Sequence, residues 1–221
     1  MHKLDFSVVL DGWQLLLQGG LATLALALAG MSLALLIGIA GVAIRQSHYR
    51  VAAVLVKTFV EVIRNTPFLV QIFFLFFALP FAGLKLSPTV TAIIALGMNG
   101  GAYAIEIIRG GIEAIPKGER EAGLALGLSR MQVFRFVVLK PALRATYPAL
   151  TSQFIMLTLT SSVCSSISAY ELTSIAQRIE SATFRSFEVF FTITAMYLVI
   201  AWMLMTMFAA IAHRHFNYPT R

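Results

Sequence analysis

Long runs of apolar residues, separated by short polar segments, dominate the pattern along the chain. A helix needs about 20 apolar residues to cross the hydrocarbon of a bilayer, and a helix satisfies its own backbone there. Five runs are long enough to predict transmembrane helices, at residues 15–44, 52–79, 89–108, 148–169 and 189–212. The pattern therefore predicts an all-α membrane protein with about five transmembrane helices, in which residues 1–221 form a single transmembrane domain.

Composition supports a membrane protein and changes how the charge is interpreted. The chain is 58% hydrophobic and 12% charged, whereas soluble domains are about half apolar and about a quarter charged. A net charge of +7 would suggest nucleic acid in a soluble protein, but basic residues also gather in cytoplasmic loops of membrane proteins. We expect the chain to interact with the lipid bilayer and not with nucleic acid. Cys164 is the single cysteine, and it is predicted to pack as a small apolar residue.

The distribution of basic residues predicts the orientation of the chain. One set of loops is rich in them, and it contains Arg45, Arg50, Lys57, Arg109, Lys117, Arg120, Arg130, Arg135, Lys140, Arg144, Arg214 and Arg221. The opposite set contains Lys3, Lys85, Arg178 and Arg185. Because the richer side is cytoplasmic, we expect the N-terminus outside and the C-terminus inside.

Charged residues occur inside two of the predicted spans. Glu61 and Arg64 lie three residues apart in the second span, and Glu106 and Arg109 repeat this spacing at the end of the third. A charge near the bilayer centre costs about 2.5–3.5 kcal/mol on insertion scales, so such groups pair with each other or face water. Two interpretations stay open for Glu61, Arg64 and Glu106: a position on a solute pathway, or local ion pairs near the headgroups.

A proline interrupts the second predicted span directly after Asn65 and Thr66. Pro67 has no backbone N–H and its ring clashes with the preceding turn, which predicts a kink or a break. At a break, Thr66 and the freed carbonyl groups could line a cavity. A plain kink that improves helix packing is the alternative.

Small and polar residues share the third predicted span. Gly97 and Gly101 lie four residues apart, a spacing that permits close helix contact. Asn99 and Tyr103 are also four residues apart, and we expect them to face a polar solute pathway.

The fourth predicted span ends in a cluster of hydroxyl groups, and Ser161 and Ser162 are assigned to the same pathway. The cluster consists of Thr158, Thr160, Ser161, Ser162, Ser165, Ser166 and Ser168. Any single hydroxyl can instead bond to the backbone of its own helix, but so dense a cluster favours contact with water or a polar solute.

The segment 110–147, between the third and fourth spans, is far longer than a simple connector. Pro116 is predicted to begin a short helix, Gly127 to break it, and Ser129 to cap the next helix. Pro141 is predicted to end or kink that second helix. Because exposed leucine and phenylalanine side chains need a partner surface, this helix–glycine–helix unit is predicted to bind another protein in the cytosol.

Three strings in this order resemble a known family. They are RNTPFLVQ at residues 64–71, GAYAIEIIRGG at 101–111 and EAGLALG at 121–127. The last is similar to the EAA motif of the membrane subunits of binding-protein-dependent ABC importers. In that family the motif reads Glu-Ala-Ala, three residues, Gly, and then an apolar stretch that ends in Leu-Pro. The whole set resembles permeases of the polar amino acid subfamily.

The resemblance implies a subunit that forms the translocation pathway of an ATP-driven amino acid importer in the bacterial cytoplasmic (inner) membrane. Its implied partners are two ATP-binding cassette ATPase subunits, a second permease chain, and a periplasmic or lipid-anchored amino acid-binding protein. ATP and Mg²⁺ would bind the ATPase, and no cofactor is expected in this chain. The resemblance assigns ATPase coupling to Glu121, Ala122, Gly123 and Gly127.

The chain departs from the family pattern at three places. Gly123 replaces the second alanine, and Lys140 separates Leu139 from Pro141. Leu159 stands where many relatives have a lysine that could bind a substrate carboxylate. We therefore expect a hetero-pair, rather than a homodimer, in which the other permease carries more of the substrate contacts.

Enzymatic activity is not expected of this chain. No Gly-x-x-x-x-Gly-Lys-Ser/Thr loop for ATP occurs in it, no nucleophile–base constellation stands out, and its four histidines are too scattered for a metal site. Two other functions remain open: a secondary transporter or channel subunit, and a non-transporting membrane anchor for a soluble partner. The identity of the amino acid does not follow from the sequence.

Overall fold

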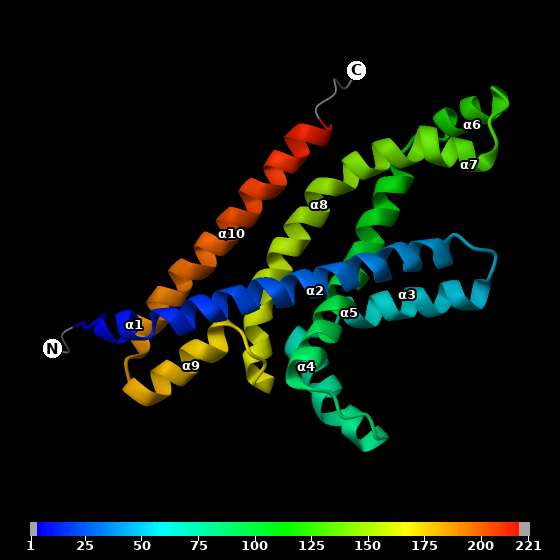
Figure 1. The fold of residues 1–221 in the computed structure, drawn as a ribbon. Coiled ribbons are helices and arrows are strands. Elements are labelled where there is room, and N and C mark those ends of the chain that lie inside the picture. Colours follow the sequence, from blue (N-terminus) through cyan, green and yellow to red (C-terminus); the bar gives the residue numbers. More distant parts are fainter. Residues whose placement is uncertain (1–3, 217–221) are drawn as a thin grey trace.

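The computed structural model describes residues 4–216, and all regular elements in that range are helical (Figure 1). Their bounds are α1 Ser7–Asp11, α2 Trp13–Arg45, α3 Arg50–Arg64, α4 Phe68–Phe73, η1 Phe74–Ala78, η2 Leu79–Ala82, α5 Pro88–Glu113, α6 Lys117–Ala125, α7 Arg130–Gln132, η3 Val133–Val138, α8 Leu139–Thr160, η4 Ser161–Ile167, α9 Leu172–Thr183 and α10 Ser186–Phe216. Elements η1 and η3 are π-helical, and η2 and η4 are 3₁₀-helical. The predicted all-α class is confirmed.

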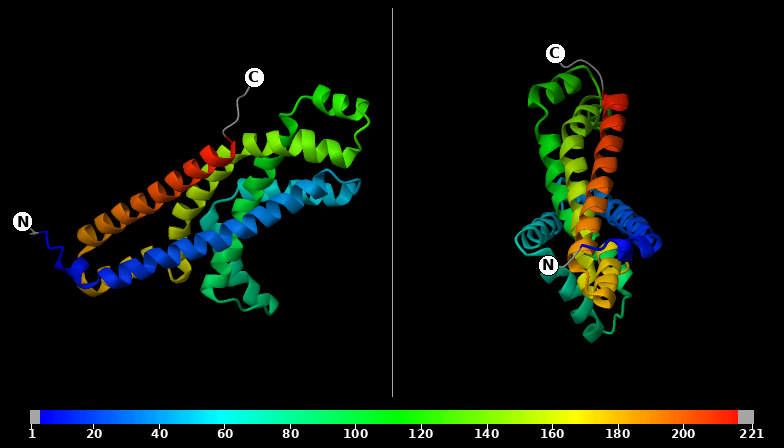
Figure 2. Two further views of the ribbon diagram at one scale, coloured as in Figure 1. Left: turned by 45° about the horizontal axis from the view of Figure 1, so that its top comes forward. Right: turned by 90° about the vertical axis from the view of Figure 1, so that its left-hand side faces the viewer.

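The described part of the chain has four helical segments that are long and apolar enough to cross a membrane, and a bent pair that makes a fifth. This agrees with the predicted number of about five. The 33 residues of α2 extend about 50 Å at 1.5 Å per residue, well beyond the hydrocarbon thickness of about 30 Å. In Figures 1 and 2, α2 runs across α5 and α8, while α4 and α6 lie at opposite ends of the molecule.

The second predicted span is broken. Helix α3 ends at Arg64, and the helical segment Phe68–Ala82 leaves it at an angle of 112°. Pro67 cannot donate a backbone hydrogen bond and disfavours helical geometry at Thr66. The side chains of Asn65 and Thr66 donate to the carbonyls of Glu61 and Val62, at 2.7 and 2.8 Å, and so cap the end of α3. Of the two alternatives, the break is the one observed.

The two predicted glycines of the third span allow α2 and α5 to pack closely. A Cβ atom at Gly97 would lie 2.4 Å from Leu33, and one at Gly101 would lie 2.6 Å from Ile37. Both distances are far below van der Waals contact. The largest buried cluster forms where α2, α5, α8 and η4 meet, and Cys164 lies in it with none of its surface exposed. Its predicted apolar packing is confirmed.

Pro141 does not end the helix that contains it. The helical segment from Arg130 to Ile167 is continuous and passes through both Pro141 and Pro148. The turn that precedes α8 is π-helical, over Val133–Val138. Because a π turn shifts the backbone hydrogen bonds by one residue, the missing N–H and the ring of Pro141 are accommodated without a break. The fourth predicted span, residues 148–169, is therefore the second half of a longer helical segment.

A buried carboxylate joins α9 to α2 and α10 at the end of the molecule opposite α6. Glu171 is fully buried, and it accepts hydrogen bonds from the Thr173 N–H and the Tyr197 hydroxyl, both at 2.8 Å. The Leu172 N–H donates to the Thr23 hydroxyl at 3.0 Å. Burial raises the pKa of the Glu171 carboxyl, although its hydrogen bonds act in the opposite direction. These contacts fix the start of α9.

Candidate functional site

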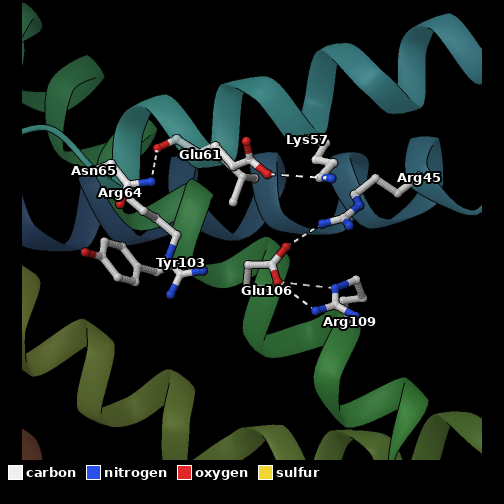
Figure 3. Close-up of a pocket in the computed structure, with 9 residues that line it drawn as sticks. Arg45, Lys57, Glu61, Arg64, Asn65, Tyr103, Glu106 and Arg109 are labelled. Carbon is white, nitrogen blue, oxygen red and sulfur yellow. Dashed lines mark hydrogen bonds and ion pairs between the residues drawn. The ribbon is translucent and has the colours of Figure 1, made fainter.

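Polar side chains from three helices line a pocket of about 400 Å³ (Figure 3). Arg45 ends α2, Lys57, Glu61 and Arg64 follow one another along α3, and Tyr103, Glu106 and Arg109 lie on α5. The charged side chains in the lining are Arg45, Lys57, Arg64, Arg109, Glu61 and Glu106. With four cations and two carboxylates, the pocket carries a surplus of positive charge. It brings together four of the predicted pathway residues: Glu61, Arg64, Tyr103 and Glu106.

Glu106 is the centre of an ion-pair network. One of its carboxylate oxygens pairs with Arg45, which is 61 positions away in the sequence, and the other accepts from Arg109 at 2.8 Å. Arg109 also pairs with Glu113 one turn further along α5. The predicted local pair between Glu106 and Arg109 is present, but it is part of a larger network that fastens the end of α2 to α5.

Glu61 and Arg64 do not pair with each other, although their spacing would permit it. Glu61 lies 3.7 Å from Lys57, and both side chains are mostly exposed. The Arg64 guanidinium lies over the ring of Tyr103, 5.2 Å from its centroid (Figure 3). A cation held by an aromatic face keeps its hydrogen-bond donors available for another ligand. Arg64 is therefore the pocket cation best placed to bind an anionic group.

A second polar group surrounds the break in the second span. Gln71 on α4 donates through its amide nitrogen to the backbone carbonyls of Ile63 and Thr66, at 2.7 and 3.0 Å. The side-chain nitrogen of Asn99 on α5 donates to the Gln71 side-chain oxygen at 3.1 Å. Two predicted pathway residues, Thr66 and Asn99, are thus joined by a residue that was not predicted. The signal for Gln71 was a lone amide within the apolar run that follows Pro67.

The other two predicted pathway residues lie apart from the polar pocket. Ser161 is fully buried, and its hydroxyl donates to the Thr158 carbonyl at 2.6 Å. The Ser162 hydroxyl donates to the Leu159 carbonyl at 2.8 Å. These local bonds follow the alternative in which each hydroxyl is satisfied by its own backbone. The role of Ser161 and Ser162 in a pathway stays a prediction.

The predicted helix–glycine–helix unit is present at one extremity of the molecule (Figure 1). Helix α6 ends in a Schellman motif, in which the Leu128 N–H bonds to the Gly123 carbonyl and the Gly127 N–H bonds to the Leu124 carbonyl. Gly127 has φ of +82°, a conformation that glycine adopts without strain. The Ser129 hydroxyl accepts from the Gln132 N–H within a capping box. The predicted break at Gly127 and cap at Ser129 are confirmed.

The unit contacts the end of α5, the helix that carries Glu106 and Arg109. A small apolar core joins Ile115 to Val133, Val138 and Ala142. The guanidinium of Arg120 on α6 donates to the Ile112 carbonyl in the last turns of α5. Contact through both a core and a hydrogen bond lets a displacement of α6 be transmitted to the pocket end of α5.

Polar and apolar side chains together make the outer surface of this unit. Glu121 and Ala122 are exposed, whereas Gly123 is buried against Val133, 3.1 Å from where its Cβ atom would be. The large apolar side chains on the surface are Leu124, Leu126, Met131, Phe134 and Phe136. Apolar exposure of this kind, rimmed by charge, is typical of a protein-binding surface.

Comparison with known proteins identifies the family. The model of the family "Binding-protein-dependent transport system inner membrane component" matches residues 30–217, and this range includes both the polar pocket and the helix–glycine–helix unit. The chain belongs to this family. It is a membrane component of a binding-protein-dependent transport system.

Curated relatives include amino acid permeases of this family. The glutamine transport system permease protein GlnP of Escherichia coli (strain K12) is 38% identical over 200 residues, which cover 90% of this chain and 91% of the relative. The L-cystine transport system permease protein TcyB of Bacillus subtilis (strain 168) is 39% identical over 150 residues, which cover 68% of this chain and 62% of the relative.

Solved structures share the fold of this permease. A chain described as part of the "Crystal structure of an amino acid ABC transporter with histidines" superposes with a TM-score of 0.90 at 30% identity. The match covers 96% of this chain and 100% of that one. A chain of the MetNI methionine ABC transporter, described as inward facing, superposes with a TM-score of 0.78 at 20% identity. That match covers 96% of this chain and 99% of the other. The second likeness concerns the fold alone.

Proposed function

We propose that this permease imports an amino acid in an ATP-driven complex and forms part of the translocation pathway. The complex would contain two ATPase subunits, a second permease chain and an extracytoplasmic amino acid-binding protein. The relatives named for glutamine and L-cystine, and the amino acid transporter structure, support the substrate class. The same relatives and the apolar helices support placement in a bacterial cytoplasmic membrane.

The observation that carries the proposal is the contact between the α6–α7 unit and the end of α5, the helix that also lines the polar pocket. Helix α5 holds Glu106 and Arg109 at the pocket, and it ends next to Ile112, whose carbonyl accepts from Arg120 on α6. A force applied to the exposed surface of α6 would therefore reach the end of α5 that carries Glu106 and Arg109. In this scheme Glu121, Ala122, Gly123 and Gly127 form the coupling element that contacts an ATPase, and the pocket lies on the solute pathway.

The positive surplus of the pocket suits the carboxylate that every free amino acid carries. Arg64, held over Tyr103, is the proposed contact for this group. Two residues are further candidates for the pathway, Asn99 and Thr66, which meet at the break in the second span through Gln71. Leu159 offers no charge to the substrate, and a hetero-pair remains the favoured assembly, because a second permease chain could supply that contact.

The decisive experiment is purification of the complex through a tag on this chain, followed by reconstitution into proteoliposomes. Co-purification of an ATPase, and uptake of a labelled amino acid that depends on both ATP and the binding protein, are the expected results. Uptake that proceeds without ATP would indicate a secondary transporter or channel instead. An identified soluble partner without any uptake would indicate an anchoring subunit. Recovery of a single permease species in the active complex would contradict the hetero-pair.

A further inference from the structure

The side chain of Gln71 has a fixed orientation. Its contacts with Ile63 and Thr66 are to backbone carbonyls, at 2.7 and 3.0 Å, and a carbonyl can only accept. The Thr66 hydroxyl, 2.9 Å away, donates its own hydrogen to the Val62 carbonyl and so also accepts from Gln71. All three partners are acceptors, and the amide nitrogen of Gln71 must therefore face the break.

This orientation determines how Asn99 is presented on α5. With its nitrogen turned to the break, Gln71 offers its oxygen Oε1 to α5, and Asn99 Nδ2 donates to it at 3.1 Å. The oxygen Oδ1 of Asn99 is consequently turned away from Gln71. No hydrogen bond reaches this oxygen from residues 4–216, where Arg120 Nε is the single buried side-chain polar atom without a partner. Asn99 Oδ1 is therefore not fully buried and is free to accept from an external donor.

Asn99 lies about one helical turn before Tyr103, which lines the polar pocket. Asn99 and Tyr103 are four residues apart on α5, and residues at this spacing share a helix face at a rise of about 6 Å. Tyr103 carries the Arg64 guanidinium over its ring. Along this face of α5 lie an acceptor, the Asn99 oxygen, and, one turn further, a cation, the guanidinium that Arg64 of α3 places over Tyr103. An amino acid, which has an ammonium group and a carboxylate, matches this order.

We propose that Gln71 is a positioning residue that fixes the Asn99 amide with Oδ1 toward the solute, where it accepts a hydrogen bond from the ammonium group of an amino acid. The inference rests on the proposed function. Gln71 touches the solute at no point. The carbonyl groups at the break accept from the Gln71 nitrogen and so turn its oxygen toward α5. Asn99 donates its nitrogen to that oxygen and presents its own oxygen to the solute.

Two substitutions of Gln71 distinguish positioning of Asn99 from a role that is limited to hydrogen bonding the carbonyls at the break. In Gln71→Lys, the ammonium still donates to the break carbonyls but also donates toward α5, so Asn99 must turn Oδ1 inward and show Nδ2 to the solute. In Gln71→Glu, an oxygen still accepts from Asn99 Nδ2, while donation to the break is lost. Positioning predicts that Gln71→Lys is the less active variant. Support of the break alone predicts the reverse order.

The readout is ATP- and binding-protein-dependent amino acid uptake by the purified complex in proteoliposomes, with ATP hydrolysis measured in the same samples. Because a hydrogen bond to a charged group is lost, uptake by Gln71→Lys should fall between about tenfold and about a hundredfold. Gln71→Glu should retain more activity. Adding Asn99→Asp to Gln71→Lys should restore uptake above either single variant, because one carboxylate oxygen accepts from the lysine and the other faces the solute.

Equal or higher uptake by Gln71→Lys than by Gln71→Glu, or no rescue in the double variant, would overturn the inference and leave the proposed function intact. Absence of ATP-dependent uptake in the unchanged complex would instead refute the proposed function. If Gln71→Lys does not assemble, Gln71→Glu is compared with Gln71→Met, which keeps the volume but neither hydrogen bond. The inference then requires more uptake from the glutamate variant, and the reverse order contradicts it.

Discussion

The turn at Gly127 gives the sharpest test of the proposed coupling element, through the substitution Gly127→Val. Nothing lies within 4 Å of the position that a Cβ atom would occupy, so a side chain there meets no steric obstacle from the rest of the protein. The whole effect comes from the backbone, because φ is +82°. A left-handed conformation costs an L-residue about 1–2 kcal/mol, and a β-branched side chain is a genuine outlier in it.

A penalty of this size acts on the hydrogen bonds that end α6. The N–H groups of Gly127 and Leu128 bond to the carbonyls of Leu124 and Gly123, at 2.9 and 3.2 Å, and both bonds need the left-handed turn. A cost of about 1–2 kcal/mol changes the population of this turn by a factor of about 5–30. Because the helical spans do not involve Gly127, insertion into the membrane should be unaffected.

The assay is amino acid uptake per ATP hydrolysed in proteoliposomes, and Gly127→Val should lower this ratio at least about fivefold. Gly127→Asn should retain most of it, since asparagine tolerates the left-handed region. Gly118→Val is the matched control, because Gly118 also has open space around it but lies within α6 without a positive φ. An unchanged ratio in Gly127→Val would refute the coupling role of the turn.

Three further substitutions test the ion pairs of Glu106, the hydrogen bond from α6 to α5, and the packing of α2 against α5. Glu106→Gln leaves Arg45 and Arg109 without their shared carboxylate. Uptake should fall about tenfold, as for a loss of about 1–2 kcal/mol, while the membrane level of the protein stays normal. Loss of the protein from the membrane would indicate a purely structural pair. Arg120→Ala removes the bond to the Ile112 carbonyl, and ATP hydrolysis without matching uptake is expected; tight coupling would exclude Arg120 from force transmission. Gly97→Val overpacks the contact between α2 and α5 and should cost about 1–3 kcal/mol, seen as a lower unfolding temperature in detergent; an unchanged temperature would mean that α2 moves aside.

The helices could be predicted from the sequence because apolar length and turn chemistry are local properties. Gly127 and Ser129 have conformational preferences that act within a few residues, and the structure places the turn and the cap where these preferences put them. Pro67 predicted a disruption but not its extent, since the angle depends on packing between distant helices. Pro141 does not end its helix as one alternative predicted, because a π turn, which local propensity does not reveal, lies directly before α8.

The polar site was accessible to sequence reasoning only in part. Intramembrane charge and polarity marked Glu61, Arg64, Tyr103 and Glu106 as candidates, and the structure gathers them in one pocket. The partners within it could not be predicted. The ion pair of Glu106 with a residue 61 positions away depends on the crossing of α2 and α5. Helical spacing alone suggested a bond between Glu61 and Arg64, but neighbouring side chains offer each of them another partner.

The central claim is that the α6–α7 unit faces the cytosol and carries movement from an ATPase to the spans. Leu126 is 82% exposed on this unit, and Cys164, the chain's single cysteine, has no exposed surface. A Leu126→Cys variant therefore offers one reactive thiol for a bifunctional cross-linker in inside-out membrane vesicles. We expect a cross-link to the ATPase subunit whose yield changes when ATP is added. Modification of this thiol from outside intact cells by a membrane-impermeant reagent, with no cross-link to an ATPase, would contradict the account.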